Sequence, residues 1–156
     1  MAHIFRSANN IYNVIICPDT YDKIISECEK YSNRETGGIL TGNYSKDNST
    51  AYIKDSYSPK DSKHYKNKFF RGIDGLDKLI DKKWGEWEYY LGEWHYHPNS
   101  SSKSSRWDDI QMIKFLNNGK LNCPEPILLV IGGNSSNWSL NLYVYKNNEK
   151  LILKKE

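Results

Sequence analysis

The chain has 156 residues, enough for one globular core but not for a second, so we expect a single domain over residues 1–156. Aromatic residues make up 13% of the composition, which provides large rings for a core and argues against disorder. The 22 Lys and Arg residues nearly balance 19 Asp and Glu, and this net charge of +3, scattered along the chain, argues against a nucleic-acid partner.

The chain begins MAHIFRSANN, which lacks the apolar region of a secretion signal. The longest apolar run, 127–131, is far shorter than the roughly 18 residues that cross a bilayer, so we expect a soluble cytoplasmic protein without a membrane partner. Three cysteines, Cys17, Cys28 and Cys123, form no CxxC pair and suit a reducing compartment. We interpret them as small buried hydrophobes, with a catalytic thiol as the alternative.

The first half of the chain predicts a strand, a helix and a hairpin. Residues 11–18 read as a strand that runs into Pro18, which can open a helix because it has no N–H to leave unpaired. Residues 36–44 and 50–58 read as two strands joined by a polar turn. The helix after Pro18 has one apolar face, formed by Tyr21, Ile24, Ile25, Cys28 and Tyr31.

The second half alternates helices and strands. A basic loop, 58–72, ends near Phe69 and Phe70, and the helix expected at about 73–87 has an apolar face of Leu76, Leu79, Ile80 and Trp84. A strand at 89–97, a third helix from Ser105 and strands at 126–133, 138–146 and 150–155 follow. This order predicts an α/β fold in which helices flank a mixed sheet.

Two histidines in the strand at 89–97 carry the strongest chemical signal. Side chains alternate along a strand, so His95 and His97 share one face while Trp94 and Tyr96 point the other way. Ser105 and Asp108 are spaced i, i+3 at the start of the third helix, and the loop before them is long enough to return that helix to the strand end. Asp108 is then available beside the two imidazoles.

Two imidazoles and a carboxylate would leave one tetrahedral position open on a zinc ion, as catalytic zinc requires. Zinc lowers the pKa of its bound water to about 7, and such a water needs a proton acceptor that is not a ligand. Our candidate is Glu35, which precedes Thr36-Gly37-Gly38 at the start of a predicted strand, where glycines let the backbone pass close to a site.

The pattern His-x-His, seven residues, then Ser-x-x-Asp, with Glu35 in "ETGGILTG", resembles the JAB/MPN metalloprotease family, also called JAMM. The resemblance covers most of the chain. It implies a single-domain JAB/MPN fold of the cytidine-deaminase-like type, with a mixed curved β-sheet flanked by about three helices. It also implies that His95, His97 and Asp108 bind one Zn²⁺, that Glu35 is the general base and acid, and that Ser105 stabilises the oxyanion.

The family likeness further implies an isopeptidase or peptidase that cleaves after the C-terminus of a ubiquitin-like protein. "YLGEWHYHP" is most similar to small bacterial JAB proteins that accompany ubiquitin-like conjugation enzymes, including those of antiphage systems, so E1- or E2-like enzymes are expected partners. The sequence departs from the family at two positions. Tyr96 replaces a small hydroxylated residue and Ser104 replaces a frequent proline, which affects contacts around the ligands but not the ligands themselves.

Other functions remain open at this level: a catalytically silent MPN-type scaffold, or another metal hydrolase with a DNA-related role. His95 and His97 could also be a polar pair at a strand end, and Glu35 a surface carboxylate.

Neighbouring residues receive structural interpretations. Asp109 leaves the Ser105 face by a helical step of about 100° and is expected in solvent. Ser105 is also a plausible N-cap. The loop 58–72 is interpreted either as a border of the groove for the substrate tail, as the resemblance implies, or as a mobile loop whose phenylalanines are anchored in the core. The remaining polar residues are read as loop filler or surface: His3, His64, Ser100, Ser101, Ser102 and Ser104.

Overall fold

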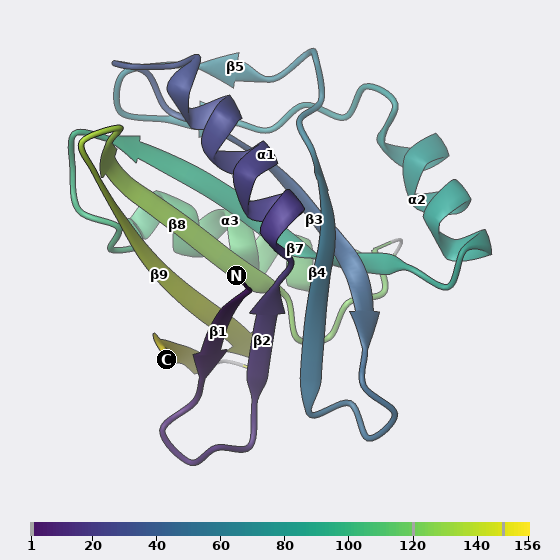
Figure 1. Ribbon diagram of the computed structural model, residues 1–156. Helices are drawn as coiled ribbons and strands as arrows, with labels where there is room; N and C mark the ends of the chain where they lie inside the picture. The colour runs from purple at the N-terminus through teal and green to yellow at the C-terminus, as the bar shows by residue number, and fades with distance from the viewer. Residues whose placement is uncertain (1, 120, 148) are drawn as a thin grey trace.

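The computed structural model describes residues 2–119, 121–147 and 149–156 (Figure 1). The helices are α1 (Pro18–Glu29), α2 (Leu76–Gly85) and α3 (Arg106–Leu116). The strands are β1 (His3–Arg6), β2 (Asn13–Ile16), β3 (Thr36–Tyr44), β4 (Thr50–Tyr57), β5 (Lys63–His64), β6 (Phe69–Phe70), β7 (Tyr89–Pro98), β8 (Ile127–Asn134), β9 (Asn137–Lys146) and β10 (Glu149–Lys155).

Eight of these strands form one sheet that closes on itself in the order β1-β10-β9-β8-β7-β3-β4-β2. The pairs β2–β4 and β7–β8 are parallel and the other pairs are antiparallel, which confirms the mixed sheet predicted from the sequence. A mixed curved sheet was expected from the sequence, but its closure into a barrel was not. This closure depends on β1, which the sequence did not predict, and on its short pairing with the last strand, where Phe5 lies opposite Lys155.

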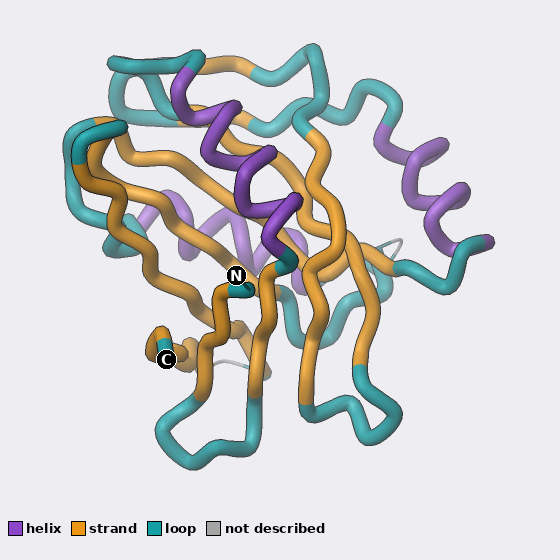
Figure 2. Tube along the Cα trace, in the orientation of Figure 1, coloured by secondary structure: helices purple, strands orange, loops and turns teal. Residues whose placement is uncertain are grey.

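Helices α1 and α3 lie on opposite sides of the sheet (Figure 2), and each side has its own apolar cluster. Ile24 and Cys28 of α1 pack against Trp94 and Tyr96 of β7 in the largest cluster. Met112 of α3 belongs to a separate cluster with residues of β8 and β9. Because side chains alternate along β7, the face opposite the first cluster is left for its histidines.

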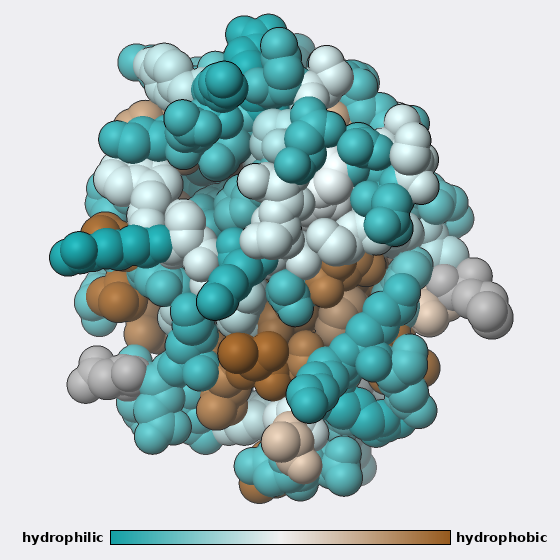
Figure 3. All heavy atoms as spheres, turned by 90° about the vertical axis from the view of Figure 1, so that its left-hand side faces the viewer, coloured by the Kyte–Doolittle hydropathy of each residue, from teal (hydrophilic) through white to brown (hydrophobic). Residues whose placement is uncertain are grey.

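The polar residues are concentrated outside these clusters. Figure 3 shows one face covered mainly by hydrophilic side chains, with separate patches of hydrophobic atoms between them. Within the described ranges, no helix combines the length and apolar character needed to cross a bilayer.

Two predicted segments differ from the structure. The second helix is shorter than the expected 73–87, and Trp84 is 54% exposed although the periodicity placed it on the buried face. Only Leu76 of that face is buried, because this short helix covers the sheet at one end. The loop 58–72 contains the antiparallel β5–β6 hairpin, in which Phe69 is buried but Phe70 is 40% exposed, so the expectation that both rings are anchored in the core is wrong for Phe70.

Candidate active site

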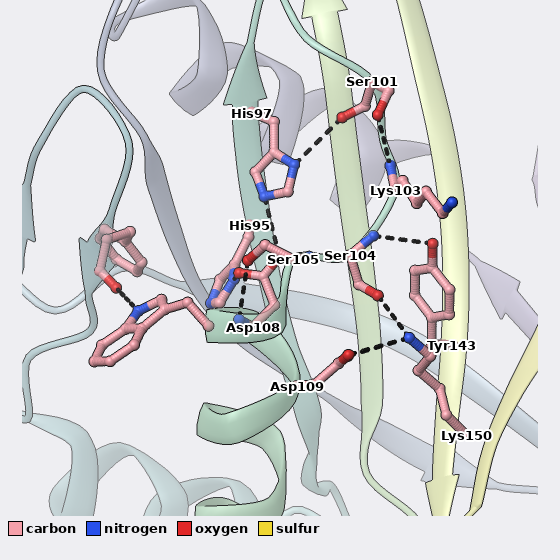
Figure 4. A network of polar contacts seen from close by, with 12 residues as sticks. His95, His97, Ser101, Lys103, Ser104, Ser105, Asp108, Asp109, Tyr143 and Lys150 are labelled. Atoms are coloured by element: carbon pink, nitrogen blue, oxygen red, sulfur yellow. Dashed lines mark hydrogen bonds and ion pairs between the residues drawn. The ribbon is translucent and has the colours of Figure 1, made fainter.

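The site forms where three elements meet: the end of β7, the residue before β3 and the first turn of α3. Figure 4 shows His95 and His97 projecting from β7 toward Asp108 at the start of α3. All three side chains are buried, with exposures of 2%, 8% and 1%. The spacing in the sequence therefore does bring the two imidazoles and the carboxylate together, as predicted.

Asp108 bonds to both imidazoles. His95 Nδ1 lies 2.7 Å from Oδ1 of Asp108, and His97 Nε2 lies 3.1 Å from Oδ2. Burial alone would raise the pKa of Asp108, but the hydrogen bonds from the two histidines and from the Ser105 N–H hold that pKa well below its usual range. The carboxylate is therefore ionised and acts as an acceptor at neutral pH.

The ring of His97 is oriented by a backbone carbonyl. Its Nδ1 lies 3.3 Å from the oxygen of Ser101, which can only accept a hydrogen bond. Burial lowers the pKa of His97, but the hydrogen bond and charge of Asp108 and the charge of Glu35 outweigh it, so the pKa is raised. Nδ1 thus carries a proton, so Nε2, which bonds to Asp108 here, is the nitrogen that would become a ligand after losing its own proton.

The loop that supplies the Ser101 carbonyl is pinned to β8. Gly133 N donates to Ser100 O at 2.9 Å, and Asn99 N donates to Gly133 O at 2.8 Å. A Cβ on Gly132 would lie 2.4 Å from Ser100 O, so the loop can approach this closely only over a glycine. From its sequence context, Ser101 was interpreted as a loop residue without a specific contact. A carbonyl contact carries no residue-type signal that could have revealed it.

Ser105 and Asp108 also form a capping box. The hydroxyl of Ser105 accepts from Asp108 N at 3.0 Å, and Ser105 N donates to Asp108 Oδ2 at 2.8 Å. The predicted N-cap is confirmed. Accepting that bond uses a lone pair of Oγ and leaves the hydroxyl proton available for donation to another acceptor.

Glu35 lies at the edge of this cluster. Thr36 is paired with Tyr96, so the antiparallel register places Glu35 beside His97. Burial raises the pKa of the Glu35 carboxyl, and the nearby charges of His97 and Asp108 act on it in opposite directions. A half-buried carboxylate with a raised pKa, next to the imidazoles, has the properties of a proton acceptor and donor.

The donor set of two imidazoles and one carboxylate suits a zinc ion in its chemistry. Ligand atoms at 2.0–2.1 Å from a tetrahedral zinc stand about 3.3 Å apart, and the observed separations of 2.7 and 3.1 Å between donors are somewhat shorter. In the described part of the chain, no group of three or more His, Cys, Asp or Glu side chains meets the geometry of a metal site. Here the carboxylate bonds directly to the imidazoles, so the donors lie closer together than the ligands of a zinc ion would.

The β5–β6 hairpin covers one side of the cluster. The ring of Phe69 meets that of His95 edge-on, with centroids 5.7 Å apart. His64 Nδ1 donates to the carbonyl of Glu35 at 3.0 Å, and its ring stacks on Tyr31 with centroids 4.2 Å apart. The expectation that His64 is a surface residue is therefore wrong, because the hairpin folds it onto the residue next to β3.

Several polar residues near the site form hydrogen bonds that the sequence did not predict. Asp109 was expected in solvent but accepts hydrogen bonds from Tyr145 and Lys150. Ser102, read as filler, is 5% exposed and accepts from Asn141 at 2.9 Å. These contacts tie the start of α3 and the preceding loop to β9 and β10.

The structure also places two tryptophans near the site and His3 at the N-terminal strand. Trp94 packs in the core on the face of β7 opposite the histidines, as predicted, and Trp107 of α3 lies against Phe70 of the hairpin. His3, expected at the surface, is half-buried and meets the ring of Tyr21.

A cavity of about 520 Å³ lies away from this cluster. Tyr44 at the end of β3 and Tyr90 at the start of β7 line it, so it occupies the opposite end of the two strands that carry Glu35 and the histidines.

Comparison with known proteins fits the geometry. Residues 18–143 match the family of prokaryotic homologs of the JAB domain. A protein of Enterobacter hormaechei named CD-NTase/cGAS isopeptidase is 38% identical over 142 residues, which are 90% of this chain and 79% of that protein. A protein of Sinorhizobium fredii named Probable metalloprotease y4qB is 21% identical over 136 residues, 85% of this chain and 83% of that protein.

A solved structure supports the fold. The solution structure of a Desulfitobacterium hafniense protein matches with a TM-score of 0.61 over 90% of this chain and 88% of the other, at 15% identity. Similarity at this identity concerns the fold alone. Because the family match spans most of the sequence and the first relative aligns along nearly all of it, the chain belongs to the JAB domain family, among its prokaryotic members.

Proposed function

We propose that the chain is a zinc-dependent peptidase or isopeptidase that cleaves after the C-terminus of a ubiquitin-like protein. The observation that carries the proposal is the convergence of His95, His97 and Asp108 with Glu35 beside them, in a chain of the JAB family. The names of the two relatives, an isopeptidase and a probable metalloprotease, support hydrolysis of an amide bond. A catalytically silent scaffold would not require these side chains to face one another.

In this proposal water attacks the scissile carbonyl directly and no acyl-enzyme forms. Glu35 accepts a proton from the attacking water and transfers it to the leaving amine, a role that its raised pKa suits. Ser105 donates its hydroxyl proton to the developing oxyanion. Zinc held by His95, His97 and Asp108 would polarise the carbonyl and acidify the water.

The other buried groups would keep these side chains in place. The Ser101 carbonyl holds the His97 ring through Nδ1, and the Ser105 N–H holds the Asp108 carboxylate. Such contacts behind metal ligands fix their orientation and raise their basicity. Water would reach the carbonyl from the side that Glu35 borders.

The name of the Enterobacter hormaechei relative extends the proposal to the substrate. We propose that this chain also acts as a CD-NTase isopeptidase, that the protein it releases is ubiquitin-like, and that E1- and E2-like enzymes form the conjugate. A place in a bacterial antiphage system is part of the same proposal. The alignment with the Enterobacter hormaechei protein supports this proposal, because the alignment spans 90% of this chain.

The test compares cleavage of two substrates by zinc-loaded protein. One is the candidate ubiquitin-like protein fused through its C-terminus to a reporter, and the other is the same protein linked to a lysine side chain of a CD-NTase. We expect the wild type to release the ubiquitin-like protein with an intact C-terminus. Glu35→Gln and His97→Ala should lower kcat/KM by about 100-fold or more, and the surface control Glu29→Gln should not.

The relative rates on the two substrates distinguish a linear peptidase from an isopeptidase. Cleavage by Glu35→Gln at the wild-type rate would contradict the assignment of Glu35. A zinc-loaded wild type that binds the conjugate but never cleaves it would favour the scaffold function instead.

A further inference from the structure

A buried ion pair lies on the site face of β7. The side chains of Arg71 and Glu93 are 5% and 0% exposed, and Nε of Arg71 lies 2.7 Å from Oε1 of Glu93. The second oxygen of Glu93 accepts from the hydroxyl of Tyr90. Arg71 also donates from Nη1 to Gly72 O at 2.8 Å, and its guanidinium lies 4.4 Å from the ring centroid of Phe115 in α3. Both charged groups therefore have partners.

The position of Tyr90 depends on an irregularity in β7. Gly92 lies opposite Leu40 and Tyr90 lies opposite Thr41, so the pairing with β3 slips by one residue between them. This bulge brings Tyr90 to the side of the strand that Glu93 occupies, although the two are an odd number of residues apart. The strand is thus shaped locally to satisfy the Glu93 carboxylate.

The pair joins the histidine strand to the hairpin. Glu93 shares one face of β7 with His95 and His97, because the three alternate along the strand. Arg71 follows β6 directly, and Phe69 of β6 contacts the ring of His95. The ion pair is therefore the charged anchor at the β6 end of the hairpin.

The other strand of the hairpin holds Glu35. Glu35 N donates to Tyr65 O at 2.8 Å, and His64 Nδ1 donates to Glu35 O at 3.0 Å. Both backbone polar groups of Glu35 are thus bonded to β5 and the residue after it. A continuous series of contacts leads from Glu93 through Arg71, β6 and β5 to the backbone of Glu35.

We propose that the Arg71–Glu93 pair is a positioning device, which fixes the β5–β6 hairpin on β7 and so fixes Glu35 relative to the two histidines. Its effect on catalysis rests on the proposed function, whereas its effect on the Glu35 backbone does not. Stability alone is a weak reason for such a pair, because well-packed apolar residues often replace a buried ion pair at no cost. The planar fork of Arg71 instead fixes direction, since it bonds Glu93 and the Gly72 carbonyl together.

The first test measures amide exchange of Glu35 by NMR in metal-free protein. The double variant Arg71→Met/Glu93→Leu removes both charges and keeps apolar bulk, so that the fold should be retained. We expect the Glu35 amide to exchange about tenfold faster or more in this variant, while the urea midpoint stays close to that of the wild type. The control Lys83→Met breaks the ion pair with Asp55 away from the hairpin and should leave Glu35 exchange unchanged.

Arg71→Lys provides a second variant if the double variant does not fold. It keeps the positive charge but cannot bond Glu93 and Gly72 O in the same way, and we expect faster Glu35 exchange here too. Wild-type exchange at Glu35 in a folded Arg71→Lys or double variant would overturn the proposal.

The second test is kinetic. In the folded variants we expect kcat on the fusion substrate to fall about tenfold or more, with KM within about twofold, because the proton acceptor rather than substrate binding is disturbed. An unchanged kcat would overturn the positioning role even if exchange became faster. If the wild type cleaves no substrate, the proposed function fails, and the exchange experiment still decides whether the pair holds Glu35.

Discussion

At the residue scale, backbone groups orient the side chains of the site. The Ser101 carbonyl orients the ring of His97, the Ser105 N–H holds Asp108, and the hairpin bonds both backbone groups of Glu35. Backbone contacts of this kind do not depend on the identity of the residue that supplies them. The sequence could therefore identify the side chains that converge, but not the groups that orient them.

Ser105 combines a structural and a proposed chemical role that two substitutions separate. Ser105→Ala removes the cap and the hydroxyl, and we expect it to lower the free energy of unfolding by about 1 kcal/mol. Ser105→Asn keeps an acceptor for the Asp108 N–H and should retain wild-type stability. Both should lower kcat by about 100-fold or more if the hydroxyl binds the oxyanion. Chemical denaturation and cleavage assays measure the two effects, and full activity in Ser105→Asn would exclude the oxyanion role.

Gly37 is required by the close packing beside the site. A Cβ there would lie 2.4 Å from Trp94 O, 2.8 Å from the Phe69 ring and 3.0 Å from His95 Cδ2. We expect Gly37→Ala to lower the free energy of unfolding by about 1–3 kcal/mol, because backbone and a buried ring must move. The matched control is Gly85→Ala, since no atom lies within 4 Å of the added Cβ. Equal unfolding midpoints in urea for the two variants would contradict this explanation.

At the element scale, the segment between β4 and α2 departs most from its sequence-based interpretation. A basic loop was expected, and the structure has a hairpin whose buried residue, Phe69, contacts His95. Its strands have only two residues each, too few for an alternating pattern to be visible. By contrast, α1, β3, β4 and β7 are long enough to show their periodicity, and their predictions are confirmed.

The side chain of Asp61 bonds to the backbone of the segment that connects this hairpin to α2. Its carboxylate accepts from Asp74 N at 2.8 Å and Ile73 N at 3.1 Å, and these backbone hydrogen bonds lower the pKa of Asp61. A lowered pKa in the folded state means that the ionised carboxylate stabilises this turn above the unfolded pKa. That contribution is lost as the pH falls through the folded value, below about pH 4.

We therefore expect protection of the Ile73 and Asp74 amides, corrected for intrinsic exchange rates, to weaken as the pH falls below about 4. Asp61→Asn should give weaker protection at neutral pH and little change on acidification, because its side chain does not titrate. Hydrogen exchange measured over a pH series checks this. The account would be wrong if the wild type and Asp61→Asn lost protection in parallel.

At the scale of the whole molecule, the sequence predicted the fold class and its family, and both are confirmed. The closure of the sheet was not predicted. It depends on a four-residue strand at the N-terminus, and the pairing of Phe5 with Lys155 joins opposite ends of the sequence. Local patterns carry no information on such a pairing, whereas the register of β3 with β7 follows from long alternating segments.

The zinc content of the purified protein tests the central claim most directly. After exposure to zinc and removal of the excess, we expect about one zinc ion per chain in the wild type and in Glu35→Gln, because Glu35 is not a proposed ligand. His97→Ala should hold much less, since one of the three proposed ligands is lost. A wild type without zinc, or a His97→Ala variant that holds as much as the wild type, would contradict the account.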